Sequence, residues 1–320
     1  MTTTATQYVG EHSDIDAARF HGEIIASGRP AILRGFVRHW PAVKLALEAP
    51  GAVCQYLADC DSAHPVDALL MAAEHKGRLF YRDDMTGFNF ARRKLPVSSV
   101  IEQLVRYSQF EEPPSVAVQS ALIDDCLPRF GRENVVPFLD GTVRPRIWLG
   151  NAITTPAHFD ESDNLACVVA GRRRFTLFAP EQVANLYIGP LDFAPTPTPI
   201  SMVDFCAPDF ARFPRFRDAQ AAALVADLGP GDALFIPTLW WHHVKSHGVL
   251  NMLVNYWWKG AAAGGTMAAM VACMQALHML APEQRRSWAA LFGHYVFDPA
   301  TDPGAHIAPG ARGVLARARP

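Results

Sequence analysis

The alternation of apolar and polar residues divides the chain into a helical beginning, a strand-rich middle and a helical end. Apolar residues recur at helical spacing in three early segments, 14–27, 41–59 and 96–107. Shorter β-prone runs lie at 30–37 and 115–121, and a hairpin is predicted over 77–91. We therefore expect residues 1–140 to supply helices and strands that flank a central domain.

From residue 145 onward, short β-prone runs follow one another, separated by glycine and proline. They occupy 145–151, the stretch around 154–164, 165–171, 173–180, 228–237, 240–246 and 249–258. This many short strands predicts a closed or double-sheet antiparallel barrel. Large all-β barrels hold about 200–250 residues in one unit, so one barrel with its core at 141–259 is expected.

A long connector, residues 180–229, interrupts these strands and carries seven prolines. Connectors of this length inside a compact domain usually have a function, such as a lid or a binding wall. A structural flap that covers the edge of a sheet is an equally good interpretation, and the sequence favours neither.

Two helices are predicted after Lys259, over 261–280 and 282–297. The first carries an apolar stripe of Met267, Met270, Val271, Met274, Leu277 and Leu280. Such a stripe often packs on its own domain, but the barrel before it should already be complete. We therefore expect the segment 260–298 to form a homodimer interface, and the Pro-, Gly- and Arg-rich residues 299–320 to be a disordered tail.

Composition narrows the possible functions of the chain. A net charge of −2 gives no general attraction to nucleic acid or to an anionic membrane. Six scattered cysteines form neither a disulfide framework nor a zinc–sulfur site. The sequence pattern shows no secretory signal peptide at its start and no uninterrupted apolar run of 18 residues that would indicate a transmembrane helix. These features predict a cytoplasmic protein with reduced thiols and no membrane or nucleic-acid partner.

The candidate chemistry begins with His158 and Asp160, which flank Phe159. In an extended strand the two side chains lie on the same face. A satisfied surface pair is the default interpretation of such a motif, but a further histidine would complete the 2-His-1-carboxylate triad of iron(II) oxygenases. The chain supplies His242 and His243 in a later strand, and alternation puts them on opposite faces.

Four motifs together, TPAHFDESDN, GRRRFTLFAPEQ, GPGDALFIPTLWWHHVKS and LVNYWW, resemble the JmjC-type, cupin-like iron(II)- and 2-oxoglutarate-dependent oxygenases. The nearest group includes the asparaginyl hydroxylase that inhibits hypoxia-inducible factor and its bacterial relatives. The resemblance covers roughly residues 28–295. It implies a mainly β fold, a double-stranded β-helix or jelly roll, with flanking N-terminal and C-terminal helices and often a helical dimer interface.

The resemblance also implies roles for individual residues. His158, Asp160 and His242 match the metal ligands, because the family's second histidine ligand directly follows two tryptophans. Thr155 and Arg173 match the residues that bind the distal carboxylate of 2-oxoglutarate. Asn164 and Asn255 match asparagines near the metal-binding end, and ordinary polar strand residues are the alternative for both.

Two positions depart from the pattern of the asparaginyl hydroxylase. Arg173 stands where that group has lysine, and arginine can bind a carboxylate through two hydrogen bonds. Ala117 stands where a tyrosine also holds the distal carboxylate. This second departure leaves open whether 2-oxoglutarate is the cosubstrate.

The sequence therefore predicts an Fe(II)- and 2-oxoglutarate-dependent dioxygenase that uses O2 to hydroxylate a protein side chain or a small metabolite. Two alternatives stay open: a cupin-type metal enzyme that does not use 2-oxoglutarate, and a non-catalytic metal-binding barrel.

Overall fold

The computed structural model describes residues 6–258, 265–298, 300 and 302–317. The chain divides into two compact units, Met1–Gly260 and Ala261–Pro320, which are described separately below. The first unit contains the sheet and every predicted site residue.

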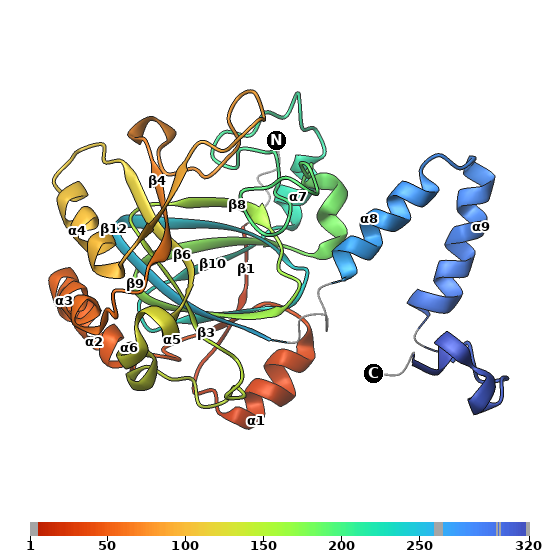
Figure 1. Cartoon of the computed structure of the whole chain (residues 1–320), viewed down its shortest axis with the longest axis horizontal. Helices are drawn as coiled ribbons and strands as arrows, with labels where there is room; N and C mark the ends of the chain where they lie inside the picture. The colour runs from red at the N-terminus through yellow and green to blue at the C-terminus, as the bar shows by residue number, and fades with distance from the viewer. Residues whose placement is uncertain (1–5, 259–264, 299, 301, 318–320) are drawn as a thin grey trace. The chain divides into compact units, whose positions relative to one another are not determined.

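Twelve strands of the first unit join in one mixed sheet that folds into two layers (Figure 1). They are β1 (Gln7–Tyr8), β2 (Gly10–His12), β3 (Ala31–Leu33), β4 (Val66–Met71), β5 (Ala91–Leu95), β6 (Ser115–Leu122), β7 (Arg146–Gly150), β8 (Thr154–His158), β9 (Asp163–Phe178), β10 (Leu224–Leu228), β11 (Ala233–Ile236) and β12 (Trp241–Trp258).

The two long strands β9 and β12 run through both layers. Their outer halves, 164–168 of β9 and 251–258 of β12, belong to the layer β2-β3-β11-β9-β12-β7-β6-β4-β5. The other halves pair with β10 and β8 and form the second layer, with β1 at its edge. This arrangement confirms the predicted mainly β, jelly-roll fold.

Glycine allows β9 and β12 to cross between the layers without a break. Gly171 has φ 75° and Gly248 has φ 88°, values that side chains disfavour. The pairing register of the two strands also shifts between His247 and Met252. Each strand was predicted as two separate strands joined by a tight turn, which is wrong because the glycines bend the strands and the pairing continues.

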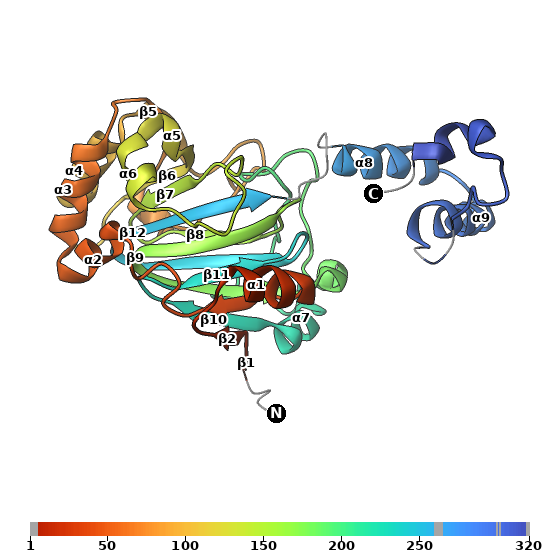
Figure 2. The ribbon, with the colours of Figure 1, turned by 90° about the horizontal axis from the view of Figure 1, so that it is seen from below.

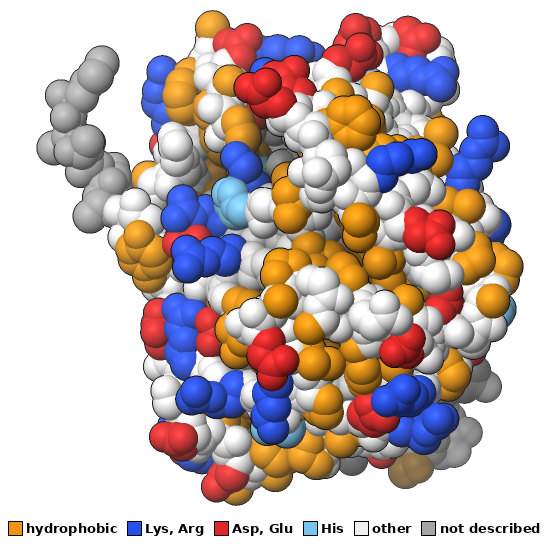
Figure 3. Space-filling view, turned by 90° about the vertical axis from the view of Figure 1, so that its left-hand side faces the viewer, with side chains coloured by type: hydrophobic (Ala, Val, Ile, Leu, Met, Phe, Trp, Pro, Cys, Tyr) orange, Lys and Arg blue, Asp and Glu red, His pale blue; other side chains and the backbone are white. Residues whose placement is uncertain are grey.

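Helices cover the outer surface of the larger layer. They are α1 (Ala17–Arg19), which continues as a π-helical turn (Phe20–Ile24) and a 3-10 turn (Ile25–Ser27), α2 (Pro41–Glu48), α3 (Pro50–Cys60), α4 (Val97–Tyr107), α5 (Ile123–Cys126) and α6 (Pro128–Glu133). Figure 2 shows α2, α3 and α4 stacked at one end of the sheet. Acidic, basic and apolar side chains intermix over this end in Figure 3.

The helical prediction for 41–59 needs one correction, because it is two helices. Pro50 begins α3, and the residue before a proline is pushed out of the helical region, so Ala49 is extended at φ −162°. The predicted hairpin over 77–91 contains only an isolated bridge between Tyr81 and Phe88. Strand β4 was not predicted.

The interior between the two layers is apolar. Its buried side chains come from both layers: Val9, Ile32, Ala166, Val168, Phe175, Leu177, Ala226, Leu228, Leu234, Ile236 and Leu253. A larger buried cluster joins α2, α3 and α4 to the outer face of the sheet. A rigid barrel packed on both faces is a suitable support for a precise site.

The second unit consists of helices. It contains α8 (Thr266–Leu277), α9 (Pro282–Phe292), a π-helical turn (Gly293–Phe297) and two 3-10 turns (Pro309–Ala311 and Gly313–Arg317). Arg312 contacts Asp302 at 3.4 Å and the carbonyl of Ile307 at 3.0 Å. The tail was expected to be disordered from 299 to 320, but the structure gives 302–317 these short turns, while 299, 301 and 318–320 lie outside the described residues.

All six cysteines are free thiols, as their spacing predicts. Among the described helices, none combines the length and the apolar character that crossing a bilayer requires.

Candidate metal centre

Strand pairing brings the two histidines of the predicted triad together. His158 ends β8, and its direct partner on β12 is His242. Their ring centroids are 4.3 Å apart, and both rings are buried. Asp160 follows two residues after β8 ends, so it lies in the loop and not on the strand. The ligand atoms of all three residues lie within 4.8 Å of one another.

The outer nitrogen of each imidazole is held by the backbone. Nδ1 of His158 lies 2.9 Å from the carbonyl of Pro156, and Nδ1 of His242 lies 3.0 Å from that of Trp240. A carbonyl oxygen only accepts, so each Nδ1 carries the hydrogen and each Nε2 keeps its lone pair for a metal. Burial also lowers the pKa of His158 to about 4, which keeps this ring neutral near pH 7.

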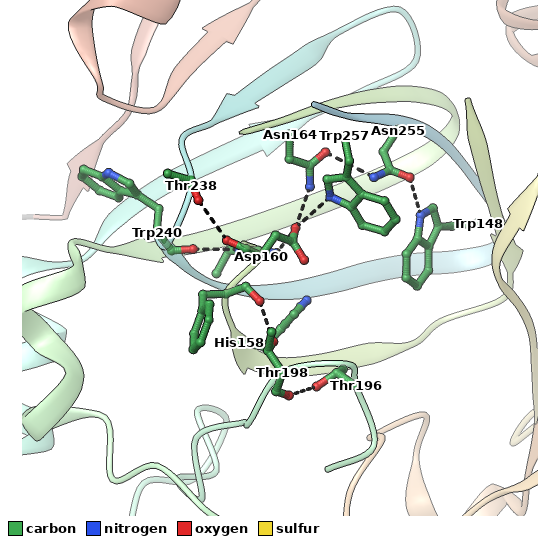
Figure 4. Close-up of polar contacts among 12 residues, drawn as sticks. Trp148, His158, Asp160, Asn164, Thr196, Thr198, Thr238, Trp240, Asn255 and Trp257 are labelled. Carbon is green, nitrogen blue, oxygen red and sulfur yellow. Dashed lines mark hydrogen bonds and ion pairs between the residues drawn. The ribbon is translucent and has the colours of Figure 1, made fainter. Parts of the chain in front are cut away.

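The carboxylate of Asp160 is oriented by two donors. Nδ2 of Asn164 and Nε1 of Trp257 each donate to Oδ2 at 3.0 Å (Figure 4). The same oxygen lies 3.7 Å from Nε2 of His242. The carboxylate is therefore fixed beside the imidazoles by the protein alone.

Two further hydrogen bonds extend this support away from the metal site. Nε1 of Trp148 donates to Oδ1 of Asn255 at 2.8 Å, and Nδ2 of Asn255 reaches Oδ1 of Asn164 at 3.3 Å (Figure 4). In this series of hydrogen bonds, Trp148 donates to Asn255, Asn255 donates to Asn164, and Asn164 donates to Asp160. Both asparagines were predicted to lie near the metal-binding end, and the structure places them behind the carboxylate of Asp160.

The two tryptophans of this network were not identified from the sequence. The signal was present in LVNYWW, because Asn255 and Trp257 are two residues apart and so share a strand face. Trp148 pairs with Leu253 across β7 and β12, and its ring meets that of Trp257 edge to face at 6.2 Å. Only the pairing of the strands, which is a long-range property, reveals this contact.

His243 lies on the opposite face of β12 from His242. Its Cα partner is Thr176, whereas the partner of His242 is Leu177, a residue of the interior core. The ring of His243 stacks on Phe205 with centroids 4.6 Å apart. Alternation therefore selects His242 as the inward histidine, as the sequence predicts.

A cavity close to the triad is lined by the residues predicted to bind the cosubstrate carboxylate. Thr155 and Arg173 line it together with Ala117, Gln119 and Trp148. Nε of Arg173 is shielded from solvent and has no hydrogen-bond partner among the described residues. Burial lowers the pKa of Arg173 to about 10, so the group remains a cation at neutral pH. A buried cation without a counter-charge is costly, and an acid in this cavity would compensate it.

The connector packs directly against β8. Within 180–229 the structure places a 3-10 helix (Pro180–Asn185) and α7 (Phe216–Ala222). The hydroxyl of Thr198 donates to the carbonyl of Phe159, and the amide of Ser201 donates to that of Ala157 at 2.8 Å. The segment therefore packs along β8 next to His158, as expected of a flap that covers a sheet edge, and a role as a binding wall stays a prediction.

Comparison with known proteins agrees with this geometry. The family model described as a cupin-like domain matches residues 17–263. Jumonji C domain-containing protein 5 of Drosophila melanogaster is 26% identical over 75% of this chain and 57% of its own length. Lysine-specific demethylase 8 of Xenopus tropicalis is 28% identical over 75% of this chain and 50% of its own.

A human relative matches over most of its length. The bifunctional peptidase and (3S)-lysyl hydroxylase JMJD7 is 28% identical over 75% of this chain and 80% of its own. By contrast, the chain spans about half the length of the Drosophila and Xenopus relatives. Because the family model matches most of the chain, residues 17–263, and this part has the expected two-layered β fold, the chain belongs to the cupin-like family of JmjC-type domains.

Proposed function

We propose that this chain is an iron(II)- and 2-oxoglutarate-dependent oxygenase that hydroxylates its substrate. The observation that carries the proposal is the triad of His158, Asp160 and His242, in which both histidines are buried, together with the unpaired Nε of Arg173 in the neighbouring cavity.

The donor set of the triad fits iron(II). Two neutral imidazoles and one carboxylate on one side of a metal match the ligands of non-haem iron oxygenases. The fixed Nδ1–H groups of His158 and His242 and the doubly hydrogen-bonded Asp160 hold these ligands in place. When bound, iron(II) with 2-oxoglutarate and O2 supplies the oxidising power, and the keto acid leaves as succinate and carbon dioxide.

The chain itself binds, orients and excludes water. Arg173 would pair with the distal carboxylate of 2-oxoglutarate, and the hydroxyl of Thr155 in the same cavity would donate to it. The connector wall, fixed to β8 through Thr198 and Ser201, would limit the access of water to the reacting C–H bond.

The substrate class that we propose is a protein side chain. Two relatives carry names that refer to lysine, a lysine-specific demethylase and a lysyl hydroxylase, and this supports a side-chain substrate here. A small metabolite is the other possibility that the sequence analysis raised.

One observation favours a second candidate function. Ala117 lines the same cavity as Arg173 and brings no hydroxyl to it. A cupin-type metal enzyme that does not use 2-oxoglutarate would have no need of that hydroxyl. The amide of Gln119, which also lines the cavity, is a donor that can take its place in the first candidate.

Arg173→Ala tests the first candidate. Loss of a charge-assisted hydrogen bond costs about 1.5–3 kcal/mol, so the apparent KM for 2-oxoglutarate should rise roughly ten- to a hundredfold. The apparent KM is measured from the rate of succinate formation as 2-oxoglutarate is varied, with saturating iron(II) and without the substrate that is hydroxylated. Arg172→Ala is the matched control, because Arg172 is the exposed neighbour on the opposite strand face and should leave KM unchanged. An unchanged KM in Arg173→Ala would mean that the acid is bound elsewhere or is not the cosubstrate.

A further inference from the structure

A cavity lies on the opposite side of β12 from the metal centre. It has a volume of about 680 Å³ and lies between the outer face of the second layer and the segment that contains α7. Figure 2 shows α7 beside β10 at this layer. Neither the family resemblance nor the proposed oxygenase reaction assigns a role to it.

Three neighbouring strands form the floor of the cavity. Val225 of β10, Thr176 of β9 and His243 of β12 are consecutive Cα partners across the sheet. Arg174 and Lys245 form the next pair along the same face. Since side chains alternate along a strand, this floor is the reverse of the surface that carries His242.

Phenylalanine rings form the wall. Phe205 contacts Phe178 edge to face at 5.6 Å and Phe216 at 4.8 Å, and Phe216 stacks with Phe210 at 6.3 Å. Phe205 also stacks on the ring of His243. A continuous aromatic wall of this kind favours a flat apolar partner.

The charged groups that line the cavity are all basic. Arg174 is neutralised by Asp227 through two hydrogen bonds of 2.7 Å. The other two cations have no carboxylate partner among the described residues: Lys245 reaches only the thiol of Cys206, at 3.9 Å, and Arg217 lies over the ring of Phe210 at 4.3 Å. Neither aspartate nor glutamate occurs among the described residues that line it.

His243 provides an independent sign that a ligand belongs here. Its side chain is buried, with 7% of the residue exposed, and it lines the cavity. Among the described residues no hydrogen bond is found for its ring nitrogens, and they are not among the polar atoms closed off from solvent, so the ring keeps polar edges open to the cavity. An occupant of the cavity with a polar end would supply a hydrogen-bond partner.

We propose that this cavity, formed by Lys245, Arg217, His243 and the phenylalanine wall, binds a small organic acid with a flat apolar body. The carboxylate meets the unpaired cations and the histidine ring, and the apolar body packs on Phe205, Phe210 and Phe216. This site is separate from the proposed 2-oxoglutarate site, because the residues lining the two cavities do not overlap and lie on opposite faces of β12.

Titration calorimetry with 2-naphthoate on the metal-free 320-residue chain tests the proposal. The unmodified protein should bind 2-naphthoate saturably and should bind the uncharged 2-naphthamide roughly tenfold or more weakly. Lys245→Met and Arg217→Met should each weaken the binding of 2-naphthoate roughly tenfold. Arg212→Met is the matched control, because Arg212 is an exposed arginine over the neighbouring Phe213 ring and does not line the cavity.

A second measurement does not depend on any variant. Cys206 is exposed and lines the cavity, so 2-naphthoate should slow its alkylation by iodoacetamide, whereas Cys273 in the second unit should react at an unchanged rate. Mass spectrometry of the two peptides measures both rates.

Several outcomes would overturn the proposal. Equal affinities for 2-naphthoate and 2-naphthamide would show that the cations do not bind the carboxylate. An absence of saturable binding would show that the cavity is not a binding site for this class of acid. Unprotected Cys206 would place the ligand elsewhere. Binding that is lost in Arg173→Ala but retained in Lys245→Met and Arg217→Met would place it in the cosubstrate cavity.

Discussion

At the scale of single residues, the metal centre depends on groups that hold the ligands from behind. Oδ2 of Asp160 accepts hydrogen bonds from both Asn164 and Trp257. Two donors to one oxygen of the carboxylate hold it in one orientation. Removal of a partner that orients a metal ligand typically lowers metal affinity by about ten- to a hundredfold.

Trp257→Phe removes one of these donors and keeps the aromatic ring that packs against Trp148. We expect the affinity for iron(II) to fall by about ten- to a hundredfold without loss of the fold. Anaerobic calorimetry with iron(II) measures the affinity, and circular dichroism checks the fold.

Trp258→Phe serves as the control. Trp258 is the next residue on the strand and packs on Phe20 and Phe235 at the other face. The affinity for iron(II) should not change in this variant. If the two variants behave alike, the indole N–H of Trp257 does not position Asp160.

The sequence indicated the three residues of the triad more clearly than the residues that support them. His158 and Asp160 are two residues apart, and the two tryptophans before His242 belong to a motif that resembles the family's, so a local pattern pointed to residues that the structure brings together. The contact of Trp257 with Asp160 joins residues 97 positions apart. It depends on the pairing of β9 with β12, which no local pattern encodes.

At the scale of elements, the continuity of β9 and β12 depends on glycine at the bend. A Cβ at position 171 would lie 2.3 Å from Oδ1 of Asn251 and 2.5 Å from the carbonyl of Leu250. A Cβ at position 248 would have no heavy atom within 4 Å among the described residues. The two glycines thus share a left-handed backbone but differ in the space around them.

This difference gives a matched pair of variants. Gly248→Ala should cost only the left-handed backbone, about 1–2 kcal/mol. Gly171→Ala should cost that and a steric overlap of about 1–3 kcal/mol more. Chemical denaturation measures both free energies of unfolding. Equal losses would show that the strand can shift at Gly171, and that the close approach to Asn251 is not required.

The same bend explains why the strands were predicted in halves. Gly171-Arg172 and the residues around Gly248 have the composition of tight turns. A glycine in a strand also marks a bulge, and only the neighbouring ladder distinguishes the two. Pro50, in contrast, is a local signal for a helix start, and α3 begins there, although 41–59 was predicted as one helix.

At the scale of the whole molecule, the second unit presents apolar side chains to solvent. Met270, Met274, Trp288 and Leu291 are each 43–51% exposed. Exposed apolar surface of this kind usually marks an interface. Two-fold pairs are the commonest soluble assembly, so we propose that α8 and α9 pair with those of a second copy of the chain.

Met270→Glu combined with Met274→Glu tests this assembly. Two unpaired charges in an apolar interface should convert a dimer to a monomer. Ala272→Glu with Ala276→Glu is the control, because these positions lie on the opposite face of α8 and should leave the dimer intact. Light scattering after size-exclusion chromatography gives the masses. A monomer mass for the unmodified protein at micromolar concentration would contradict the proposal.

The most direct test of the account is an anaerobic titration with iron(II) in the presence and absence of 2-oxoglutarate. Iron(II) bound by His158, Asp160 and His242 and chelated by the keto acid should produce a metal-to-ligand charge-transfer band. The band should require both components, and Asp160→Ala should abolish it because the anionic ligand is lost. His247→Ala should retain the band, because His247 is an exposed histidine of β12, the strand that carries His242. A band of unchanged intensity in Asp160→Ala, or no band in the unmodified protein with both components present, would contradict the proposed oxygenase site.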